Sequence, residues 1–292
     1  MNVPVEATMK KVLLQLDSDR HPSAFDRIVA HDAGADEVLS YGGVVPGDVA
    51  PLVYGAIFTR GPGDLRHTAI WIGGSDVAAG DALLEAAKKA LFGPFRVSLM
   101  MDSNGCNTTA AAAVARLAGT MDLKGQRVVI LAGTGPVGVR AAVLLAREGA
   151  SVTLTSRSLD RARAAGDQLK RGFRVEVEAV EARDDAGVAA ALTGAGACLT
   201  AGAAGTTLLR RSVWAAHPTL RALADVNAVP PLGIEGIEAA DKGMEREGKR
   251  VFGALGVGGL KMKVHKTCVA RLFERNDEVL DIGEIYSVAR SI

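Results

Sequence analysis

The feature that most constrains the fold is a glycine pattern within residues 127–138, which read RVVILAGTGPVG. Gly133, Gly135 and Gly138 follow an apolar, β-branched run and precede a stretch with helical spacing. In such a strand-turn-helix segment the first glycine permits a tight turn and the second lets the backbone approach a pyrophosphate, while the third permits close packing of the helix. The pattern predicts a dinucleotide-binding unit, and a glycine-rich turn without a ligand is the structural alternative.

The predicted cofactor loop depends on more than its glycines. Pro136 suits the first turn of the helix, where free backbone N–H groups and a partial positive charge favour an anion. The residues expected to contact the dinucleotide in this loop are Gly133, Thr134, Gly135, Pro136, Val137 and Gly138.

Apolar runs and helical stretches alternate along the chain, which predicts βαβ units and mainly parallel sheets with helices on both faces. We expect two α/β domains, the second a Rossmann-type doubly wound parallel sheet. The expected ranges are a substrate domain at 1–120, a cofactor domain at 121–255, and a segment at 256–292 whose helices return to the first domain. The expected strands lie at 11–17, 68–72, 95–101, 128–131, 152–154, 175–177 and 198–200.

Composition narrows the class of protein further. The chain has 292 residues, more than one hydrophobic core usually fills, and its 48% apolar and 23% charged residues are typical of a globular protein. Its net charge of +1 gives no general attraction for nucleic acid or anionic lipid. Residues 1–11 do not resemble a signal peptide, and the three cysteines are too far apart to suggest a disulfide framework. We therefore expect a cytoplasmic protein without a nucleic-acid partner, a membrane partner or a bound metal.

The second strand of the predicted cofactor domain ends at Ser156, Arg157 and Ser158, where NAD enzymes usually carry an acid for the ribose 2′-hydroxyl. A guanidinium flanked by hydroxyls suits a 2′-phosphate instead, because it offers forked, charge-assisted hydrogen bonds. Arg161, one helical turn later, is expected to face the same group. The sequence therefore predicts NADP as the cofactor, with NAD accepted. A solvated surface arginine is the alternative interpretation of Arg157.

Five segments give the chain a family resemblance. They read LDSD (16–19), GPFRVSLMMDSNGCNTTAAA (93–112), AGTGPVG (132–138), ADVNAVPPLGIEGI (224–237) and FGALGVGGLKMKVHK (252–266). With these segments the chain resembles the NAD(P)-dependent methylene-tetrahydromethanopterin and methylene-tetrahydrofolate dehydrogenases of methylotrophic bacteria, along nearly its whole length.

The resemblance implies hydride transfer from the methylene carbon of a reduced pterin to nicotinamide, in formaldehyde and one-carbon metabolism, by a homo-oligomer. The reacting carbon lies between two nitrogens whose lone pairs stabilise the cation formed, so the step needs positioning and electrostatics more than a proton-transfer residue. The pterin carrier is either tetrahydromethanopterin or tetrahydrofolate. Two other functions stay open, an NADP-linked dehydrogenase of the shikimate type and a non-catalytic NADP-sensing protein.

The resemblance also implies site residues, which we expect at the carboxyl ends of strands around a cleft between the two domains. The implied reaction-site residues are Lys261, Thr109 and Asp17. The implied substrate-binding residues are Asp19, Asp102, Ser103, Asn104 and Asn107, and Asn227 is expected in a rigid loop near the nicotinamide. The alternatives are a plain Asx turn at 102–105, an exposed lysine at 261 and an ordinary connecting loop at 227.

Overall fold

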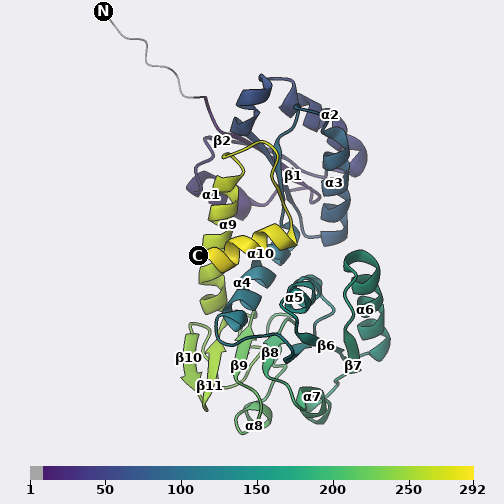
Figure 1. The fold of residues 1–292 in the computed structure, drawn as a ribbon, viewed down its shortest axis with the longest axis vertical. Coiled ribbons are helices and arrows are strands. Elements are labelled where there is room, and N and C mark those ends of the chain that lie inside the picture. Colours follow the sequence, from purple (N-terminus) through teal and green to yellow (C-terminus); the bar gives the residue numbers. More distant parts are fainter. Residues whose placement is uncertain (1–8) are drawn as a thin grey trace, which may run out of the picture. The chain divides into compact units, whose positions relative to one another are not determined.

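The computed structural model describes residues 9–292, which form two compact units (Figure 1). Unit 1 comprises the described residues up to Gly105 together with His265–Glu284, and unit 2 comprises Cys106–Val264 with Ile285–Ile292. The expectation about residues 1–11 falls mainly on residues 1–8, which lie outside the described residues. Within residues 9–292, no helix is long and apolar enough to cross a bilayer.

Unit 1 is built on a five-stranded, all-parallel sheet with the order β12-β4-β3-β1-β2. Its strands are β1 (Val12–Asp17), β2 (Glu37–Tyr41), β3 (Thr68–Gly73), β4 (Ser98–Met101) and β12 (Val279–Leu280). Its first three helices are α1 (Ala24–Asp32), α2 (Pro46–Ile57) and α3 (Val77–Ala90). The strand order reverses between β1 and β3. In an open α/β sheet, the crevice at the carboxyl ends of two such strands is where ligands bind.

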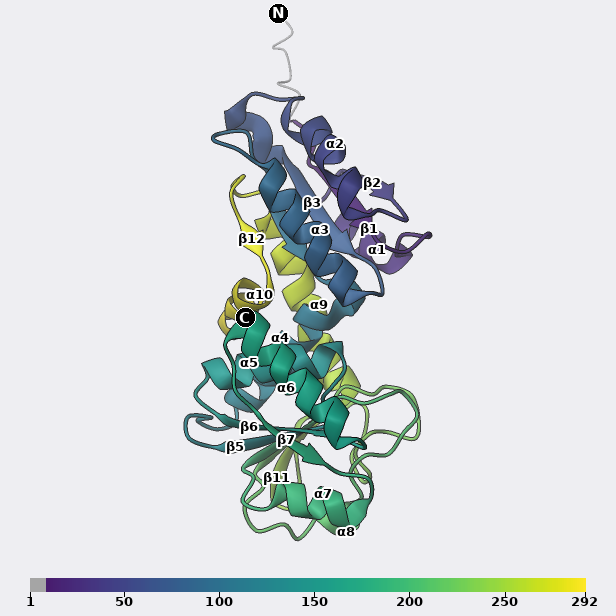
Figure 2. The same cartoon turned by 90° about the vertical axis from the view of Figure 1, so that its right-hand side faces the viewer.

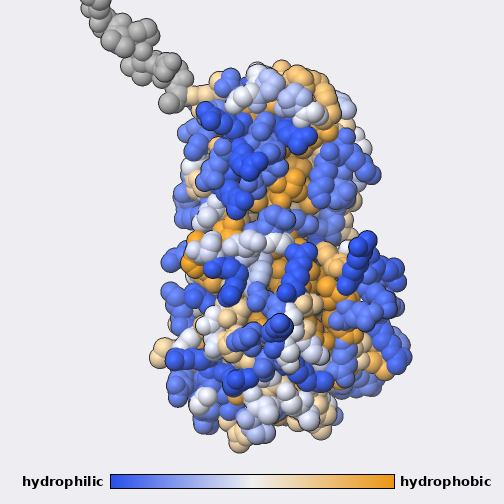
Figure 3. Space-filling view, in the orientation of Figure 1, coloured by the Kyte–Doolittle hydropathy of each residue, from blue (hydrophilic) through white to orange (hydrophobic). Residues whose placement is uncertain are grey.

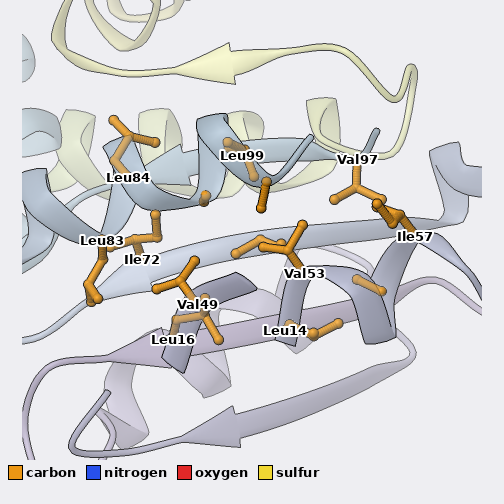
Figure 4. Packing of buried hydrophobic residues seen from close by; sticks show 14 of the residues in the cluster. Leu14, Leu16, Val49, Val53, Ile57, Ile72, Leu83, Leu84, Val97 and Leu99 are labelled. Carbon is orange, nitrogen blue, oxygen red and sulfur yellow. The ribbon is translucent and has the colours of Figure 1, made fainter. Parts of the chain in front are cut away.

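The two faces of the unit 1 sheet are covered by different helices, because successive side chains of a strand point to opposite faces. On β3, Ile70 and Ile72 join the buried core beneath α2 and α3 (Figures 2 and 4). Trp71 points the other way, and its ring stacks on His265 with centroids 4.5 Å apart and planes 3° apart. Phe25 of α1 packs on the same imidazole at 6.1 Å.

Unit 2 contains a seven-stranded sheet with the order β10-β11-β9-β8-β5-β6-β7. Its strands are β5 (Arg127–Leu131), β6 (Ser151–Ser156), β7 (Glu178–Glu181), β8 (Ala197–Thr200), β9 (Ala222–Asp225), β10 (Lys242–Arg246) and β11 (Lys249–Phe252). All pairings are parallel except the one between β10 and β11. Read from β7 to β11, the parallel strands have the classical Rossmann order, with the reversal between β5 and β8. The predicted fold class is therefore confirmed.

The helices of unit 2 cover both faces of its sheet (Figures 1 and 2). They are α4 (Cys106–Ala118), α5 (Pro136–Arg147), α6 (Leu159–Phe173), α7 (Asp185–Leu192) and α8 (Arg211–Trp214). Two further helices, α9 (Ala254–Arg271) and α10 (Ile282–Ser291), each run through the boundary between the units in sequence. The surface over α6 is largely hydrophilic (Figure 3), which fits its many charged residues.

The observed boundaries differ from the ranges expected from the sequence. Helix α4 belongs to unit 2 rather than to the first domain, because it packs on α5 and Arg116 donates from Nη2 to the carbonyl of Gly256 at 3.4 Å. Of the segment after residue 255, only residues 265–284 belong to unit 1.

One predicted strand is misplaced. The strand expected at 175–177 is β7, which lies at Glu178–Glu181. Helix α6 continues to Phe173 and ends on Arg174, which adopts a left-handed conformation with φ of 57°. The residues that follow connect this cap to the sheet, and pairing with β6 begins only at Glu178. The two valines at 175 and 177 therefore indicated that a strand lies nearby, but they did not show where its pairing with β6 begins.

Candidate functional site

A pocket of about 930 Å³ lies at the carboxyl ends of the central strands of unit 2. Its walls come from the turns that follow β5, β6, β7 and β8, on both sides of the point where the strand order reverses. Thr134, Gly135 and Pro136 line it from the glycine loop. Gly133, Val137, Gly138 and Asn227, which were also predicted to bind the cofactor, are not among its lining residues. A volume of this size can hold most of a dinucleotide.

The three glycines of the loop have distinct physical roles. A Cβ on Gly138 would lie 2.3 Å from the carbonyl oxygen of Gly133, so the start of α5 packs directly on the turn. A Cβ on Gly133 would lie 2.8 Å from the side chain of Ile130. A Cβ on Gly135, by contrast, would meet no atom closer than the carbonyl oxygen of Ala201, at 4.0 Å. Gly135 therefore keeps open space at the pocket wall, which is what close approach of a pyrophosphate requires.

The start of α5 has the features of an anion-binding surface. Gly135 is the N-cap residue and has no side chain with which to satisfy the first backbone N–H groups of the helix. Ala132, just before the motif, has φ of 52°, and its amide donates to Thr155 Oγ1 at 3.2 Å. This uncommon conformation for a non-glycine residue turns the chain sharply after β5. The loop fits the phosphates of a dinucleotide by both its shape and its electrostatics.

The opposite end of the pocket carries arginines, with Asp184 and Asp185 also in its lining. Ser156, Arg157, Ser158 and Arg161, which were expected from the sequence around the 2′-phosphate, line this end after β6. Among the described residues, no ion pair engages Arg157 or Arg161, and both side chains are exposed. Arg183, which follows β7, lines the same pocket and was missed from the sequence. With the third strand expected three residues too early, Arg183 was not recognised as a strand-end residue.

A buried carboxylate organises the loop that follows β9. Asp225 is fully buried and accepts four hydrogen bonds: from Thr200 Oγ1 at 2.7 Å and from the backbone amides of Asn227, Gly233 and Ile234 at 2.9, 2.8 and 3.3 Å. Such a satisfied carboxylate acts as a fixed anchor for the backbone. Asp225 was not singled out from the sequence, although it lies inside one of the segments that carry the resemblance.

Asn227 has a supporting rather than a lining position in this structure. Its Nδ2 donates to the carbonyl of Pro231 at 3.1 Å, and its Oδ1 accepts from the amides of Val229 and Gly205 at 3.0 and 3.4 Å. The contact with Gly205 ties the loop after β9 to the loop after β8, whose residues Ala201–Ala203 line the pocket. The side chain thus connects two loops at the carboxyl edge of the sheet.

In unit 1, the acids after β1 lie at the reversal point of the sheet. Asp17 is 1% exposed and accepts from the amides of Asp19 and Ser23 at 2.8 and 3.0 Å. The carboxylate of Asp19 accepts from both the amide and the hydroxyl of Ser75, at 3.0 and 2.8 Å. These bonds fold the loop after β1 and fasten it to the loop after β3. Each carboxylate oxygen retains further acceptor capacity.

The loop after β4 joins the same edge. Asp102 and Ser103 are buried, and Ser103 Oγ donates to the carbonyl of Gly73 at 3.0 Å. Asn104 is exposed, adopts a left-handed conformation with φ of 55°, and donates its amide to the carbonyl of Gly74 at 2.7 Å. Unit 1 therefore gathers Asp17, Asp19, Asp102, Ser103 and Asn104 at one end of its sheet, and their expected part in substrate binding stays a prediction.

The remaining predicted residues lie on two helices of unit 2. Asn107 and Thr109 lie in the first turn of α4, the former buried and the latter half-buried, and Lys261 is half-buried on α9. Helices α4 and α9 lie side by side and run in opposite directions (Figure 1), with the end of α4 hydrogen bonded to the start of α9 through Arg116 and Gly256.

Comparisons with known proteins identify the family of the chain. Residues 24–104 match the family described as "Methylene-tetrahydromethanopterin dehydrogenase, N-terminal". The chain is 35% identical over 294 residues to the NAD(P)-dependent methylenetetrahydromethanopterin dehydrogenase of Methylorubrum extorquens, covering 97% of this chain and 99% of that protein. The chain belongs to the methylenetetrahydromethanopterin dehydrogenase family. It is also 52% identical over 285 residues to "Bifunctional protein MdtA" of the same organism, covering 97% of this chain and 99% of that protein.

Solved structures show the likeness in fold. Shikimate 5-dehydrogenase from Listeria monocytogenes, in complex with shikimate and NAD, matches with a TM-score of 0.54 and 12% identity over 96% of each chain. Shikimate 5-dehydrogenase from Mycobacterium fortuitum matches with a TM-score of 0.52 and 16% identity over 99% of each chain. At sequence identities this low, the similarity shows a shared fold and does not indicate a shared function. The predicted family, the enzyme class of NAD(P)-dependent oxidoreductase and the nicotinamide cofactor are confirmed, and the shikimate-type alternative is not favoured.

Because Gly135 and Gly138 have different surroundings, substitutions at the two positions should have different effects on cofactor binding and on stability. Gly135→Val should leave the fold intact and weaken NADP binding by about tenfold or more, because the new side chain occupies the space open to the pyrophosphate. Gly138→Ala should instead lower the free energy of unfolding by about 1–3 kcal/mol, since its Cβ collides with backbone. Calorimetric titration and thermal denaturation measure the two effects. A Gly135→Val protein with unchanged NADP affinity would show that this turn does not hold the cofactor.

Proposed function

We propose that the chain oxidises the methylene carbon of 5,10-methylene-tetrahydromethanopterin to the methenyl form, with NADP⁺ as the preferred hydride acceptor. The observation that carries the proposal is the pocket of unit 2, in which an open glycine turn and a basic end come together in a member of this enzyme family. The bound nicotinamide supplies the carbon that accepts the hydride. The residues of the chain bind, orient and enclose the two reactants.

The residues present fit a dinucleotide phosphate. The turn at Gly135 and the first backbone N–H groups of α5 would hold the pyrophosphate. Arg157 and Arg161 would hold the 2′-phosphate with charge-assisted hydrogen bonds. Neither arginine forms an ion pair with another of the described residues. At this end of the pocket the strand that follows the glycine loop carries no acid that would repel a phosphate. This distribution supports NADP over NAD.

The residues proposed to contact the pterin are, in unit 1, polar groups at the strand ends and, in unit 2, residues of α4 and α9. Lys261 would donate a hydrogen bond to a pterin carbonyl and so fix the ring, since a cation cannot stabilise the cationic methenyl product. Thr109 would assist with its hydroxyl. Asp17, whose carboxylate already accepts two backbone amides, would act by shaping the loop rather than by exchanging a proton. The rest of the proposed substrate-binding set is Asp19, Asp102, Ser103, Asn104 and Asn107.

The remaining proposals rest on the family. The chain would act as a homo-oligomer in the cytoplasm, in formaldehyde oxidation and one-carbon metabolism. The reacting ring is the same in methylene-tetrahydromethanopterin and methylene-tetrahydrofolate.

The test of the function is a spectrophotometric assay with purified protein. NADP⁺ and each methylene carrier are mixed in turn, and reduced nicotinamide and the methenyl chromophore are followed at their separate absorbance bands. Equal amounts of both products are expected with methylene-tetrahydromethanopterin. The same assay with methylene-tetrahydrofolate measures the second carrier, and the absence of turnover with either carrier would refute the proposal.

Replacement of Arg157 tests the cofactor preference. Arg157→Ala should raise the KM for NADP about tenfold or more while changing the KM for NAD little, because a hydrogen bond to a charged group is worth roughly 1.5–3 kcal/mol. Steady-state kinetics with both cofactors, at one ionic strength, give the comparison. An equal loss with NADP and NAD would show that Arg157 supports the pocket in general and does not read the 2′-phosphate.

Replacement of Lys261 tests the reaction site. Lys261→Ala should lower kcat about tenfold or more, or roughly 1.4 kcal/mol, with NADP affinity nearly unchanged, because the pterin is no longer oriented. Lys263→Ala is the matched control, since Lys263 is exposed on the same helix. Wild-type turnover in a folded Lys261→Ala protein that still binds NADP would remove Lys261 from the site.

A further inference from the structure

Two neighbouring strands bring a second arginine to the basic end of the pocket. Strands β6 and β7 pair in parallel with Ser156 opposite Glu181, and the amide of Ala182 donates to the carbonyl of Ser156 at 2.8 Å. The residues that follow the two strands therefore leave the sheet side by side. Arg157 and Arg183 are among them, and both line the pocket.

Arg183 has a specific partner, the carboxylate that ends β7. Arg183 Nη2 lies 2.9 Å from Glu181 Oε1, and the same oxygen accepts from the amide of Leu159, the first residue of α6, at 3.3 Å. Glu181 thus places a negative charge next to the helix start and beside the loop that carries Arg157. A phosphate dianion bound there would be repelled by this carboxylate if nothing neutralised it.

We infer that Arg183 is a further specificity-determining residue, which admits the 2′-phosphate of the cofactor by neutralising Glu181 and by offering its guanidinium to the phosphate. This inference rests on the proposed preference for NADP. The side chains of Arg183 and Glu181 are 69% and 38% exposed, so their ion pair is weak and its geometry is easily exchanged. The planar guanidinium has five N–H donors, and Arg183 can retain Glu181 while it donates to a phosphate.

The role of Glu181 explains why Arg183 matters more for one cofactor than for the other. A ribose 2′-hydroxyl carries no charge, so a nearby carboxylate does not oppose it, whereas a 2′-phosphate meets the full charge of Glu181. Loss of Arg183 removes an attractive charge and at the same time exposes a repulsive one. The effect on a 2′-phosphate ligand should therefore be reversed in part when Glu181 is also made neutral.

The test uses two fragments of the cofactor as probes, adenosine 2′,5′-bisphosphate and adenosine 5′-monophosphate, titrated calorimetrically into the full-length protein at low ionic strength. Arg183→Ala should weaken the bisphosphate about fivefold or more and the monophosphate by less than about twofold, because only the former carries the 2′-phosphate. Glu181→Gln combined with Arg183→Ala should recover at least half of the loss on a logarithmic scale. Arg163→Ala, which removes an exposed arginine of α6 that does not line the pocket, should leave both affinities unchanged.

The controls distinguish a failure of the inference about Arg183 from a failure of the proposed 2′-phosphate site. If Arg157→Ala weakens the bisphosphate but Arg183→Ala does not, the inference about Arg183 is wrong and the 2′-phosphate site stands. If neither variant changes the affinity, the 2′-phosphate site itself is misassigned. An equal loss for both fragments in Arg183→Ala, or no recovery in the double variant, would also overturn the role given to Arg183 and Glu181.

Discussion

The direct packing of α5 on the turn after β5 is the contact on which the cofactor site depends. Because a Cβ at Gly138 would lie 2.3 Å from the carbonyl of Gly133, the helix can approach the strand end only with glycine at that position. This approach aims the helix N-terminus at the crevice where the strand order reverses, and Gly135 keeps that crevice open. The arginines after β6 line the same pocket.

Carboxylates act as fixed acceptors for backbone amides at the ligand-facing edges of both units. Asp225 binds three amides and a hydroxyl after β9, Asp17 binds two amides after β1, and Asp19 ties the loop after β1 to Ser75 after β3. A loop at the end of a parallel strand cannot satisfy its amides within the sheet, so a short acidic side chain is an effective organiser. This explains why acids are found at the strand ends of both units.

The local sequence pattern was sufficient to predict the fold class and the glycine loop, because a strand-turn-helix unit is specified by about fifteen consecutive residues. It was insufficient for features that depend on contacts between strands or helices far apart in the sequence. The third strand of the cofactor unit was expected at 175–177 but pairs with β6 only from Glu178, and the shift hid Arg183. The assignment of α4 to unit 2 is set by its contacts with α5 and Gly256, far away in sequence. Likewise, hydrogen bonds from the backbone decide that Asp17 shapes a loop, and no spacing reveals them.

Both sheets have a point where the strand order reverses, but the charged residues near that point differ between the two units. In unit 2 the first strand is followed by glycines, a free helix start and nearby arginines, which together favour an anion. In unit 1 the first strand ends on Asp17 and is followed by Asp19, and a Cβ on Gly74 after β3 would collide with Ser18 Oγ, so the turn after β1 carries two acids and is closely packed. Such a turn disfavours a phosphate and instead suits a neutral ring that carries N–H donors. The amino-pyrimidine edge of a pterin has that chemistry, which supports the proposal that the strand ends of unit 1 take part in binding the pterin.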